Sequence, residues 1–481
     1  MERRLIESIF DQATGMGAEF VEVYMEEKTS VATIFENSKV EDIYQNTDTG
    51  IGIRVLNGKE SAYGYTNDLE KEAILSLAKR VGESVQGKGN SVILAQDKAV
   101  AEKFDEVEHF SLDDQVNWLK MGDQCLSEKE NVKQSSLSIS DVHQKVTIAN
   151  TEGCYVEDER YRRRANARVI LDKDGDVQTG YASYGVTGEG NLFMEKDFNG
   201  LCEEAYHHGS NLLSAMPCKG GRLPVVMASS AGGTMVHEAC GHGLEADLVE
   251  RGISAYKDKL ETEVASPEIS VIDDGAMASR FGTSYYDDEG YKTQENVLID
   301  HGILKRYMCD LHTSKKTNWA QTGNGRRESY RHKPQTRMTT TYIKPGNEQA
   351  EDIIKGVKEG LLVTKMGGGQ VDVLSGDYVF DVSEGYWINN GEISHAVRGA
   401  TLAGNGPKSL RDVSQVGSDL GFGIGVCGKG GQGAPVADAQ PTMRIENLVI
   451  GGVISDDEVT GLTLIAEPVG VICGITPTTN P

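Results

Sequence analysis

The sequence predicts an α+β protein whose N-terminal half contains antiparallel sheets with flanking helices and whose C-terminal half is rich in strands. Three observations predict this fold class. Apolar residues at helical spacing open the chain, segments of alternating apolar and polar residues follow, and 56 glycines stand against 11 prolines. Because glycine marks tight turns and strand ends, and is concentrated in the second half, that half should contain many strands and few helices.

The first half is predicted to contain a helix-then-strands order twice, which suggests an internal duplication. The first copy has helices over 5–13 and 69–85, and between them short strands at 20–25, 30–36, 40–45, 51–56 and 61–65. Asn57-Gly58 predicts a hairpin turn in this region. The second copy, over 112–184, has a helix over 113–128 and strands at 137–140, 145–149, 165–171 and 180–184, and a further helix is expected over 202–213.

A break near residue 218 is predicted to divide the chain into two domains. A chain of 481 residues is too long for one ordinary core. The segment Pro217-Cys-Lys-Gly-Gly221 interrupts the helical pattern, and glycine becomes more frequent after it. We therefore expect an N-terminal α+β domain over 1–218 and a strand-rich, metal-binding catalytic domain over 219–481.

Composition excludes several classes of protein. The 48 Lys and Arg against 73 Asp and Glu give a net charge of −25, which repels a phosphate backbone, so no nucleic-acid partner is expected. No apolar run approaches the roughly 18 residues that cross a bilayer, so we expect no membrane association. The charged start and the eight cysteines without paired spacing predict a cytoplasmic protein with reduced thiols.

The chemistry of the chain centres on His237-Glu238-Ala-Cys-Gly-His242, which follows a predicted buried strand at 223–228 and a turn at 229–234. Two histidines with a glutamate directly after the first are typical of zinc hydrolases. The imidazoles bind the metal, and the carboxylate takes a proton from water. This pattern predicts His237 and His242 as ligands and Glu238 as the general base, although a buried histidine is more often only a hydrogen-bonded core residue.

The spacing of these histidines is one residue longer than in the usual zinc motif. Ligands four residues apart share one helix face, whereas His237 and His242 would lie about 140° apart around a regular helix. Both can bind one ion only if a π-bulge distorts the helix or if the helix ends between them. Gly241 and Gly243, which flank His242, should make either distortion easy.

A protein zinc site that is catalytic needs a third ligand, and the residues alone leave three candidates. Glu261 and Glu263 are downstream carboxylates at a suitable distance. Cys427 lies in the glycine-rich stretch 421–432, where flanking glycines allow close approach to another element. Parts of this stretch match a P-loop and a dinucleotide fingerprint by letters, but both motifs open a helix, and Pro435 and Pro441 argue against one. We therefore expect no nucleotide cofactor.

Several ordered motifs together resemble one family along essentially the whole chain. They are the segment 237–247, Asp273-Asp-Gly275 with 286–290, Gly323-Asn-Gly-Arg-Arg327 with Arg337-Met-Thr339, and 427–432 with Gln440-Pro-Thr442. The chain resembles the TldD-type members of the TldD/PmbA (TldE) metalloprotease family, formerly called modulators of DNA gyrase. Thr340 departs from this resemblance, because an asparagine is expected there.

The resemblance implies a site, a substrate and a partner. His237, His242 and Cys427 would bind zinc, and Glu238 would be catalytic. The substrate would be an unfolded or extended peptide, and the chain would form a homodimer or a heterodimer with a metal-free TldE/PmbA-type paralogue. Two other functions remain open: a non-catalytic regulatory or scaffold protein with a structural metal site, and a metal-dependent hydrolase of a non-peptide amide.

Other charged groups have a structural and a functional interpretation. Arg326, Arg327 and Arg337 either bind a substrate carboxylate or an oxyanion, or tie loops together. Four aspartates suggest turn capping more strongly than a calcium site: Asp273, Asp274, Asp287 and Asp288. The cluster Arg160, Arg162, Arg163 and Arg164 is predicted to be a solvated or interface strand and not a nucleic-acid patch.

Overall fold

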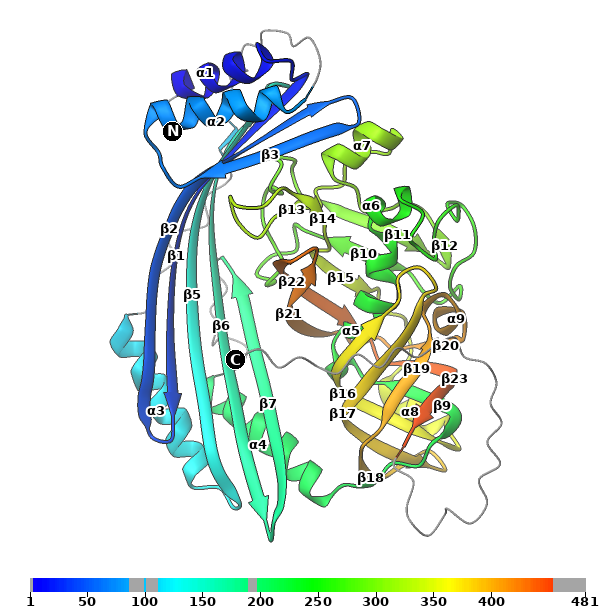
Figure 1. Cartoon of the computed structure of the whole chain (residues 1–481). Coiled ribbons are helices and arrows are strands. Elements are labelled where there is room, and N and C mark those ends of the chain that lie inside the picture. Colours follow the sequence, from blue (N-terminus) through cyan, green and yellow to red (C-terminus); the bar gives the residue numbers. More distant parts are fainter. Residues whose placement is uncertain (1–2, 86–98, 101–110, 189–196, 453–481) are drawn as a thin grey trace.

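The computed structural model describes residues 3–85, 99–100, 111–188 and 197–452. An N-terminal half built on one long, curved sheet lies beside a C-terminal half built on two further sheets (Figure 1). Most neighbouring strands are antiparallel, and long helices occur only in the described part of the first half. The α+β class is therefore confirmed. In the described residues, no helix has the length and apolar character needed to cross a membrane.

The N-terminal sheet is centred on two antiparallel strands, β1 and β5, which pair from Glu22 opposite Asn150 to Glu36 opposite Ser136. The strand order is β3-β2-β1-β5-β6, and both β4 and β7 pair with β6. The strands are β1 (Phe20–Glu36), β2 (Lys39–Asn57), β3 (Glu60–Thr66), β4 (Ala99–Val100), β5 (Val132–Asn150), β6 (Tyr155–Lys173) and β7 (Asp176–Thr187). The turn at Asn57-Gly58 is confirmed, since Asn57 pairs with Glu60 across a two-residue loop.

The prediction of many short strands in this half is wrong. Segments 20–25 and 30–36 belong to one strand, β1, and segments 40–45 and 51–56 belong to β2. In the same way, β5 contains both 137–140 and 145–149. The polar residues between the predicted strands of β1 remain in the sheet, paired on both sides with β2 and β5. One of them, Glu26, faces the other half of the protein and accepts a hydrogen bond from the backbone N–H of Tyr330 at 2.7 Å.

Two pairs of helices cover one face of this sheet. Helices α1 (Arg3–Thr14) and α2 (Lys71–Glu83) pack at one end, and α3 (Leu112–Ser127) and α4 (Phe198–Ser214) pack at the other (Figure 1). Val21 lies in the first core and Phe35 in the second. These two residues of β1 are an even number of positions apart, so they point to the same face. The predicted repeat of a helix followed by strands is confirmed, and the structure shows three strands and a closing helix in each copy.

The C-terminal half contains a sheet that closes on itself. Strand β16 pairs with both β9 and β17, and the pairings β9–β23, β23–β19 and β19–β17 complete a ring. Strands β8, β18 and β20 extend it. The strands are β8 (Met216–Pro217), β9 (Gly221–Met227), β16 (Glu359–Val371), β17 (Asp377–Asn389), β18 (Glu392–Arg398), β19 (Thr401–Asn405), β20 (Val413–Val416) and β23 (Met443–Gly451).

A second, six-stranded sheet in this half ends at an edge strand, β21. Its order is β12-β11-β10-β15-β22-β21, with β10 (Val271–Asp274), β11 (Glu295–Asp300), β12 (Ile303–Leu304), β15 (Thr340–Ile343), β21 (Gly421–Lys429) and β22 (Gln432–Gln440). A small hairpin lies beside it, β13 (Gly325–Arg326) with β14 (Gln335–Thr336). Short helices complete the half: α5 (Thr234–Val236), α6 (Ala246–Glu250), α7 (Leu311–Thr317), α8 (Ala350–Lys355) and α9 (Gly406–Arg411).

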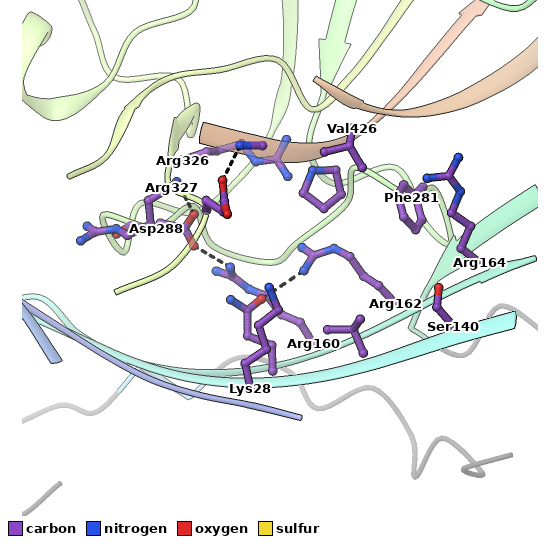
Figure 2. A pocket seen from close by; sticks show the side chains of 15 residues that line it. Lys28, Ser140, Arg160, Arg162, Arg164, Phe281, Asp288, Arg326, Arg327 and Val426 are labelled. Carbon is purple, nitrogen blue, oxygen red and sulfur yellow. Dashed lines mark hydrogen bonds and ion pairs between the residues drawn. The ribbon is translucent and has the colours of Figure 1, made fainter. Parts of the chain in front are cut away.

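Buried ion pairs join the two halves. Glu22 of the N-terminal sheet binds Arg327 of the C-terminal half at 2.5 Å and also binds Arg54, and all three side chains are nearly inaccessible to solvent. Arg160 binds Asp288 at 2.6 Å (Figure 2). Arg160 therefore lies at the interface between the two halves, and it is 3% exposed. Arg162 and Arg163 are also buried and not solvated, whereas Arg164 is partly exposed.

We predict that Glu22→Ala lowers the free energy of unfolding by about 3–5 kcal/mol, because it removes a buried carboxylate shared by Arg54 and Arg327. Chemical denaturation measures this change. Lys39→Ala is the control, since Lys39 forms an exposed pair with Glu41 and should change stability little. Equal stability of the two variants would contradict the structural role of the buried pairs.

Candidate metal centre

The two histidines are carried by a short helical segment between the two C-terminal sheets. Strand β9 ends at Met227, a 3₁₀ turn covers Ser229–Ala231, and α5 then leads directly into His237. The segment contacts β15 and β22 of one sheet and β16 and β17 of the other. Val236, Ala239 and Cys240 are buried in the core of this half, so the backbone of the motif is fixed by packing on both sides.

A π-helical turn solves the spacing problem of the motif. Residues His237–Gly241 form this turn, and the backbone N–H of His242 donates to the carbonyl oxygen of His237, five residues earlier. A π-turn contains more residues than an α-helical turn, so side chains five apart come to the same side. The imidazole centroids are 5.0 Å apart, with planes at 88°. From the sequence, we considered a π-bulge or a helix end between the two histidines. The structure has the π-helical turn between them, and a 3₁₀ turn begins at His242.

The two glycines of the motif are needed because a side chain at either position would collide with its neighbours, and not because the backbone angles are unusual. Gly241 has φ −52°, which any residue can adopt. A Cβ atom on Gly241 would lie 2.2 Å from the sulfur of Met338, and one on Gly243 would lie 2.6 Å from the ring of Tyr256. We expected Gly241 and Gly243 to make the helix easy to distort. In the structure, their lack of a side chain allows neighbouring residues to pack closely around the turn.

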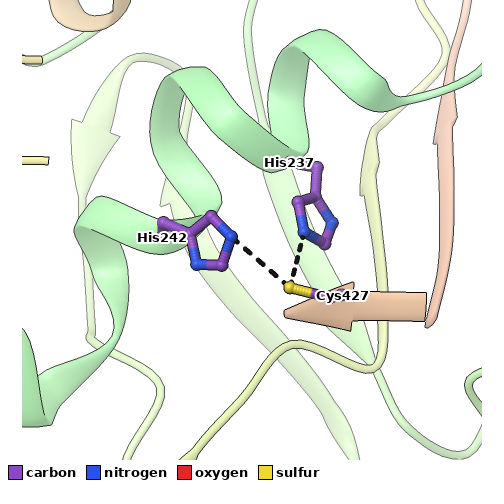
Figure 3. A group of neighbouring side chains, drawn as sticks. All are labelled: His237, His242 and Cys427. Carbon is purple, nitrogen blue, oxygen red and sulfur yellow. Dashed lines mark hydrogen bonds between the residues drawn. The ribbon is translucent and has the colours of Figure 1, made fainter. Parts of the chain in front are cut away.

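The third residue of the cluster, Cys427, comes from the β21–β22 hairpin. The turn of this hairpin is Gly430-Gly431, and both residues have positive φ (59° and 76°), as a two-residue hairpin turn requires. The glycine-rich stretch is thus a pair of strands and not a nucleotide-binding loop. Cys427 Sγ lies 3.2 Å from His237 Nε2 and 3.4 Å from His242 Nε2 (Figure 3).

These three side chains form a donor set suited to a metal ion. One ligand atom from each of His237, His242 and Cys427 lies within 4.8 Å of the others, and all three residues are buried. Among the residues that the structure describes, no other such cluster occurs. Two imidazoles and one thiolate fit zinc, which favours nitrogen and sulfur ligands. The alternative ligands Glu261 and Glu263 are exposed and lie outside the cluster, and Glu261 pairs with Lys305 at 2.7 Å.

The local electrostatics favour the metal-binding form of the cysteine. Burial alone raises the pKa of the Cys427 thiol, but the hydrogen bonds from His237 and His242 outweigh burial and lower it to about 5. For His237 the effects have the opposite sign. Burial lowers the pKa of its imidazole, and the contact with Cys427 outweighs burial, so that the pKa is raised above its usual value. These contacts favour the thiolate form of Cys427, which is the form that binds metal.

Glu238 lies beside this cluster at the wall of a cleft. Its Oε2 is 3.8 Å from His242 Nε2, and its side chain is 26% exposed. Burial raises the pKa of Glu238 above its usual value. The cleft has a volume of about 470 Å³ and is also lined by Gln370 at the end of β16 and by Cys427 and Lys429 of β21. Glu238 can thus exchange a proton with a molecule in the cleft.

A buried carboxylate that the sequence analysis missed orients His242. Glu245 Oε2 lies 3.2 Å from His242 Nδ1, which leaves Nε2 directed at Cys427. Glu245 is fully buried, and Lys429 neutralises it at 3.0 Å. Burial raises the pKa of Glu245, but Lys429 and His242 outweigh burial and lower it to about 2. The position of Glu245, three residues after His242, was the available signal, since histidine ligands commonly contact a carboxylate.

The three arginines singled out in the sequence, Arg326, Arg327 and Arg337, make different contacts in the structure. Arg337 donates hydrogen bonds to the carbonyl oxygens of Cys427 and Gln432 and thus fixes the hairpin that carries the cysteine. Arg327 ties the two halves together, as described above. Arg326 donates to the carbonyl of Met338 at 2.6 Å, and its side chain also lines a second cavity. Arg327 and Arg337 therefore tie loops together, and both Arg326 and Arg327 line this second cavity.

The aspartates of the family-like motifs cap turns and strands. Asp287 accepts hydrogen bonds from the backbone N–H groups of Glu289, Tyr291 and Gly325. Asp273 accepts from Thr339 and Thr341. These bonds confirm the capping interpretation, and the described residues show no calcium-type cluster at these positions. The hydroxyl of Thr340, where an asparagine is expected, is buried and has no hydrogen-bond partner.

Comparisons with known proteins match most of the chain. Three family models match it: "PmbA/TldA metallopeptidase domain 1" at residues 21–85, the "central domain" at 105–213 and the "C-terminal domain" at 220–452. These ranges divide the chain in three, and our division into 1–218 and 219–481 stays a prediction.

Individual relatives agree with the family models. A metalloprotease TldD homolog from Haemophilus influenzae is 33% identical over 92% of this chain and 95% of its own length. A zinc metalloprotease TldD homolog from Saccharolobus solfataricus is 31% identical over 60% of this chain and 64% of its own. The crystal structure of TldE from Thermococcus kodakarensis has a similar fold, with a TM-score of 0.75, 18% identity and coverage of 93% of this chain and all of the other.

We predict that Glu245→Ala lowers zinc affinity about 10–100-fold, because His242 loses the carboxylate that orients it. Competition with a chromogenic chelator measures the affinity. Glu261→Ala and Glu263→Ala are the matched controls and should bind zinc as the wild type does. A loss of zinc in either control, with normal affinity in Glu245→Ala, would contradict this assignment of the site.

Proposed function

The chain belongs to the PmbA/TldD metallopeptidase family, and we propose that it is a zinc-dependent peptidase that hydrolyses unfolded or extended peptides. The observation that carries this proposal is the convergence of His237 Nε2 and His242 Nε2 on the Cys427 thiolate. Three protein ligands leave a position for water or substrate, as catalytic zinc sites require. The cleft beside the cluster gives a substrate access to that position.

His237, His242 and Cys427 would hold the ion. A zinc ion in this position supplies a Lewis acid that polarises a peptide carbonyl and makes water a stronger nucleophile near neutral pH. The protein's part is to fix the three donors, and it does so through the π-helical turn, the Arg337 bonds to the hairpin and the contact between Glu245 and His242.

Glu238 is the proposed general base. It is the carboxylate next to the donor set that faces the cleft, because Glu245 is fully buried and paired with Lys429. A carboxylate with a raised pKa accepts a proton from the attacking water and gives it up again to the leaving amine more readily than an ordinary one. Glu238 would therefore carry the proton between the two halves of the reaction.

The edge strand β21 supports an extended peptide as the substrate. β21 is the last strand of the six-stranded sheet and carries Cys427. Val426, next to this cysteine, lies opposite Pro435 in a pair that shares no backbone hydrogen bonds, because this set of β22 residues directs its N–H groups toward β15, as Ala437 does toward the carbonyl of Thr339. The N–H and C=O of Val426 therefore point to the open edge of β21. A peptide that adds to this edge would be held through its main chain, which gives affinity with little sequence preference. Folded proteins would then be poor substrates.

We further propose that the protein acts in the cytoplasm as a dimer, with a second copy or with a metal-free TldE/PmbA-type relative. The free thiols of all seven cysteines in the described residues agree with a reducing compartment. The net charge of −25 argues against a nucleic-acid partner. The proposal of a dimer rests on the resemblance of this chain to the family.

Two linked measurements test the proposed function: zinc content of the purified protein and hydrolysis of an unfolded polypeptide. We expect about one zinc per chain, lost in Cys427→Ser and retained in the matched control Cys240→Ser, whose thiol bonds only the helix backbone. Glu238→Gln should keep its zinc and lose about 10²–10⁴-fold in cleavage rate.

Two outcomes would contradict the proposed function. One is a wild-type protein without zinc after purification and metal reconstitution. The other is undiminished cleavage by Glu238→Gln. If the wild type binds zinc but cleaves only after a metal-free relative is added, the heterodimer is the working form.

A further inference from the structure

A second cavity, of about 360 Å³, lies between the N-terminal sheet and the β21–β22 hairpin (Figure 2). We call it the arginine pocket. It is lined by six basic side chains: Lys28, Arg160, Arg162, Arg164, Arg326 and Arg327. Only two acidic side chains, Asp288 and Glu328, are among the described residues that line it. A pocket with this excess of positive charge is unusual in a protein with a net charge of −25.

Part of this positive charge is compensated by the protein itself. Arg160 binds Asp158 at 2.7 Å and Asp288 at 2.6 Å, and Arg327 binds Glu22 at 2.5 Å. These pairs belong to the junction between the two halves. Of the other four basic side chains, Lys28 and Arg164 are partly exposed, which leaves Arg162 and Arg326 as the buried cations to be explained.

Arg162 and Arg326 are buried cations that have no carboxylate within ion-pair distance in the described part of the chain. They are 8% and 5% exposed. Arg162 donates only to the amide oxygen of Gln144, at 3.1 Å, and its Nε is buried without a partner. Arg326 donates only to the carbonyl oxygen of Met338, at 2.6 Å. Buried charges in folded proteins are normally paired, so a group of two unpaired guanidinium ions indicates a missing anion.

The titration behaviour of these two groups agrees with a missing anion. Burial lowers the pKa of Arg162 to about 9, and the neighbouring charges of Arg160 and Arg326 add to this effect. Burial also lowers the pKa of Arg326 to about 10, with contributions from Arg337 and Arg160. A bound anion would stabilise the charged form of both guanidinium groups, which burial and the neighbouring positive charges disfavour.

The position of the arginine pocket connects it to the metal centre. Successive residues of a strand point to opposite faces, so Cys427 of β21 faces the histidines while Val426 faces the arginine pocket. Val426 lines both the arginine pocket and the cleft that contains Glu238. A peptide lying along the edge of β21 would therefore pass from one cavity to the other.

We propose that the arginine pocket binds a carboxylate group of the peptide substrate through Arg162 and Arg326. The planar guanidinium group is suited to two-point binding of a carboxylate. Asp288 and Glu328 in the wall make a monoanion a better fit than a phosphate dianion. The carboxylate is either the C-terminus of the peptide or an acidic side chain. This inference rests on the proposed peptidase function and adds a substrate preference to it.

The test measures binding of three fluorescent peptides to the intact, zinc-loaded protein by anisotropy. The peptides share one unstructured, neutral sequence: one ends in a free carboxylate, one in an amide, and one in an amide with a single internal glutamate. The variants are Arg162→Gln and Arg326→Gln, which keep a polar side chain and remove an unpaired buried charge, so neither should unfold the protein. Arg168→Gln, on the exposed part of the same strand, is the matched control.

We expect the wild type and Arg168→Gln to bind at least one carboxylate-bearing peptide about tenfold or more tightly than the amide without glutamate, as a charge-assisted hydrogen bond implies. In Arg162→Gln and Arg326→Gln this ratio should fall to about one. Preference for the free C-terminus or for the internal glutamate identifies the source of the carboxylate.

Three results would overturn the inference. They are equal wild-type affinity for all three peptides, a carboxylate preference that survives in both arginine variants, and thermal stabilisation by inorganic phosphate that depends on Arg162 while peptide carboxylates have no effect. The proposed peptidase function is judged separately, by hydrolysis of the amide peptide without glutamate. Failure of that hydrolysis leaves the binding result valid.

Discussion

One backbone hydrogen bond, from the N–H of His242 to the carbonyl of His237, is the constraint on which the metal centre depends. In a regular α-helix these side chains would point about 140° apart. The π-turn brings both imidazoles to one side, where each directs Nε2 at Cys427. Packing holds the turn in place: a Cβ on Gly406 of α9 would lie 1.9 Å from the carbonyl oxygen of Ala239, inside the turn.

The rest of the chain holds the hairpin opposite this turn. Arg337 binds the carbonyl of Cys427, and Arg337 follows β14, whose partner strand β13 leads into Arg327. Arg327 in turn binds Glu22 of the N-terminal sheet. A continuous series of contacts therefore joins the N-terminal half to the cysteine. The arginine pocket lies where the two halves meet, because residues of both line it.

The sequence was sufficient for features set by local pattern or by residue chemistry. The helices of the first half follow from apolar spacing, and the helix predicted over 113–128 corresponds to α3. His237, His242 and Cys427 were chosen by donor chemistry and by resemblance, and the structure brings them together. Features set by distant contacts were missed: strand β1 continues through Glu26, which is paired with β2 and β5 and bonded by Tyr330, and Glu245 matters because Lys429 neutralises it.

X-ray absorption at the zinc edge of the purified protein tests the central claim most directly, because it reports the atoms bound to the metal. Our account predicts one sulfur at about 2.3 Å and two imidazole nitrogens at about 2.0–2.1 Å. The sulfur signal should disappear in Cys427→Ser. A zinc environment without sulfur in the wild type, or one whose sulfur survives in Cys427→Ser, would contradict a centre built from His237, His242 and Cys427.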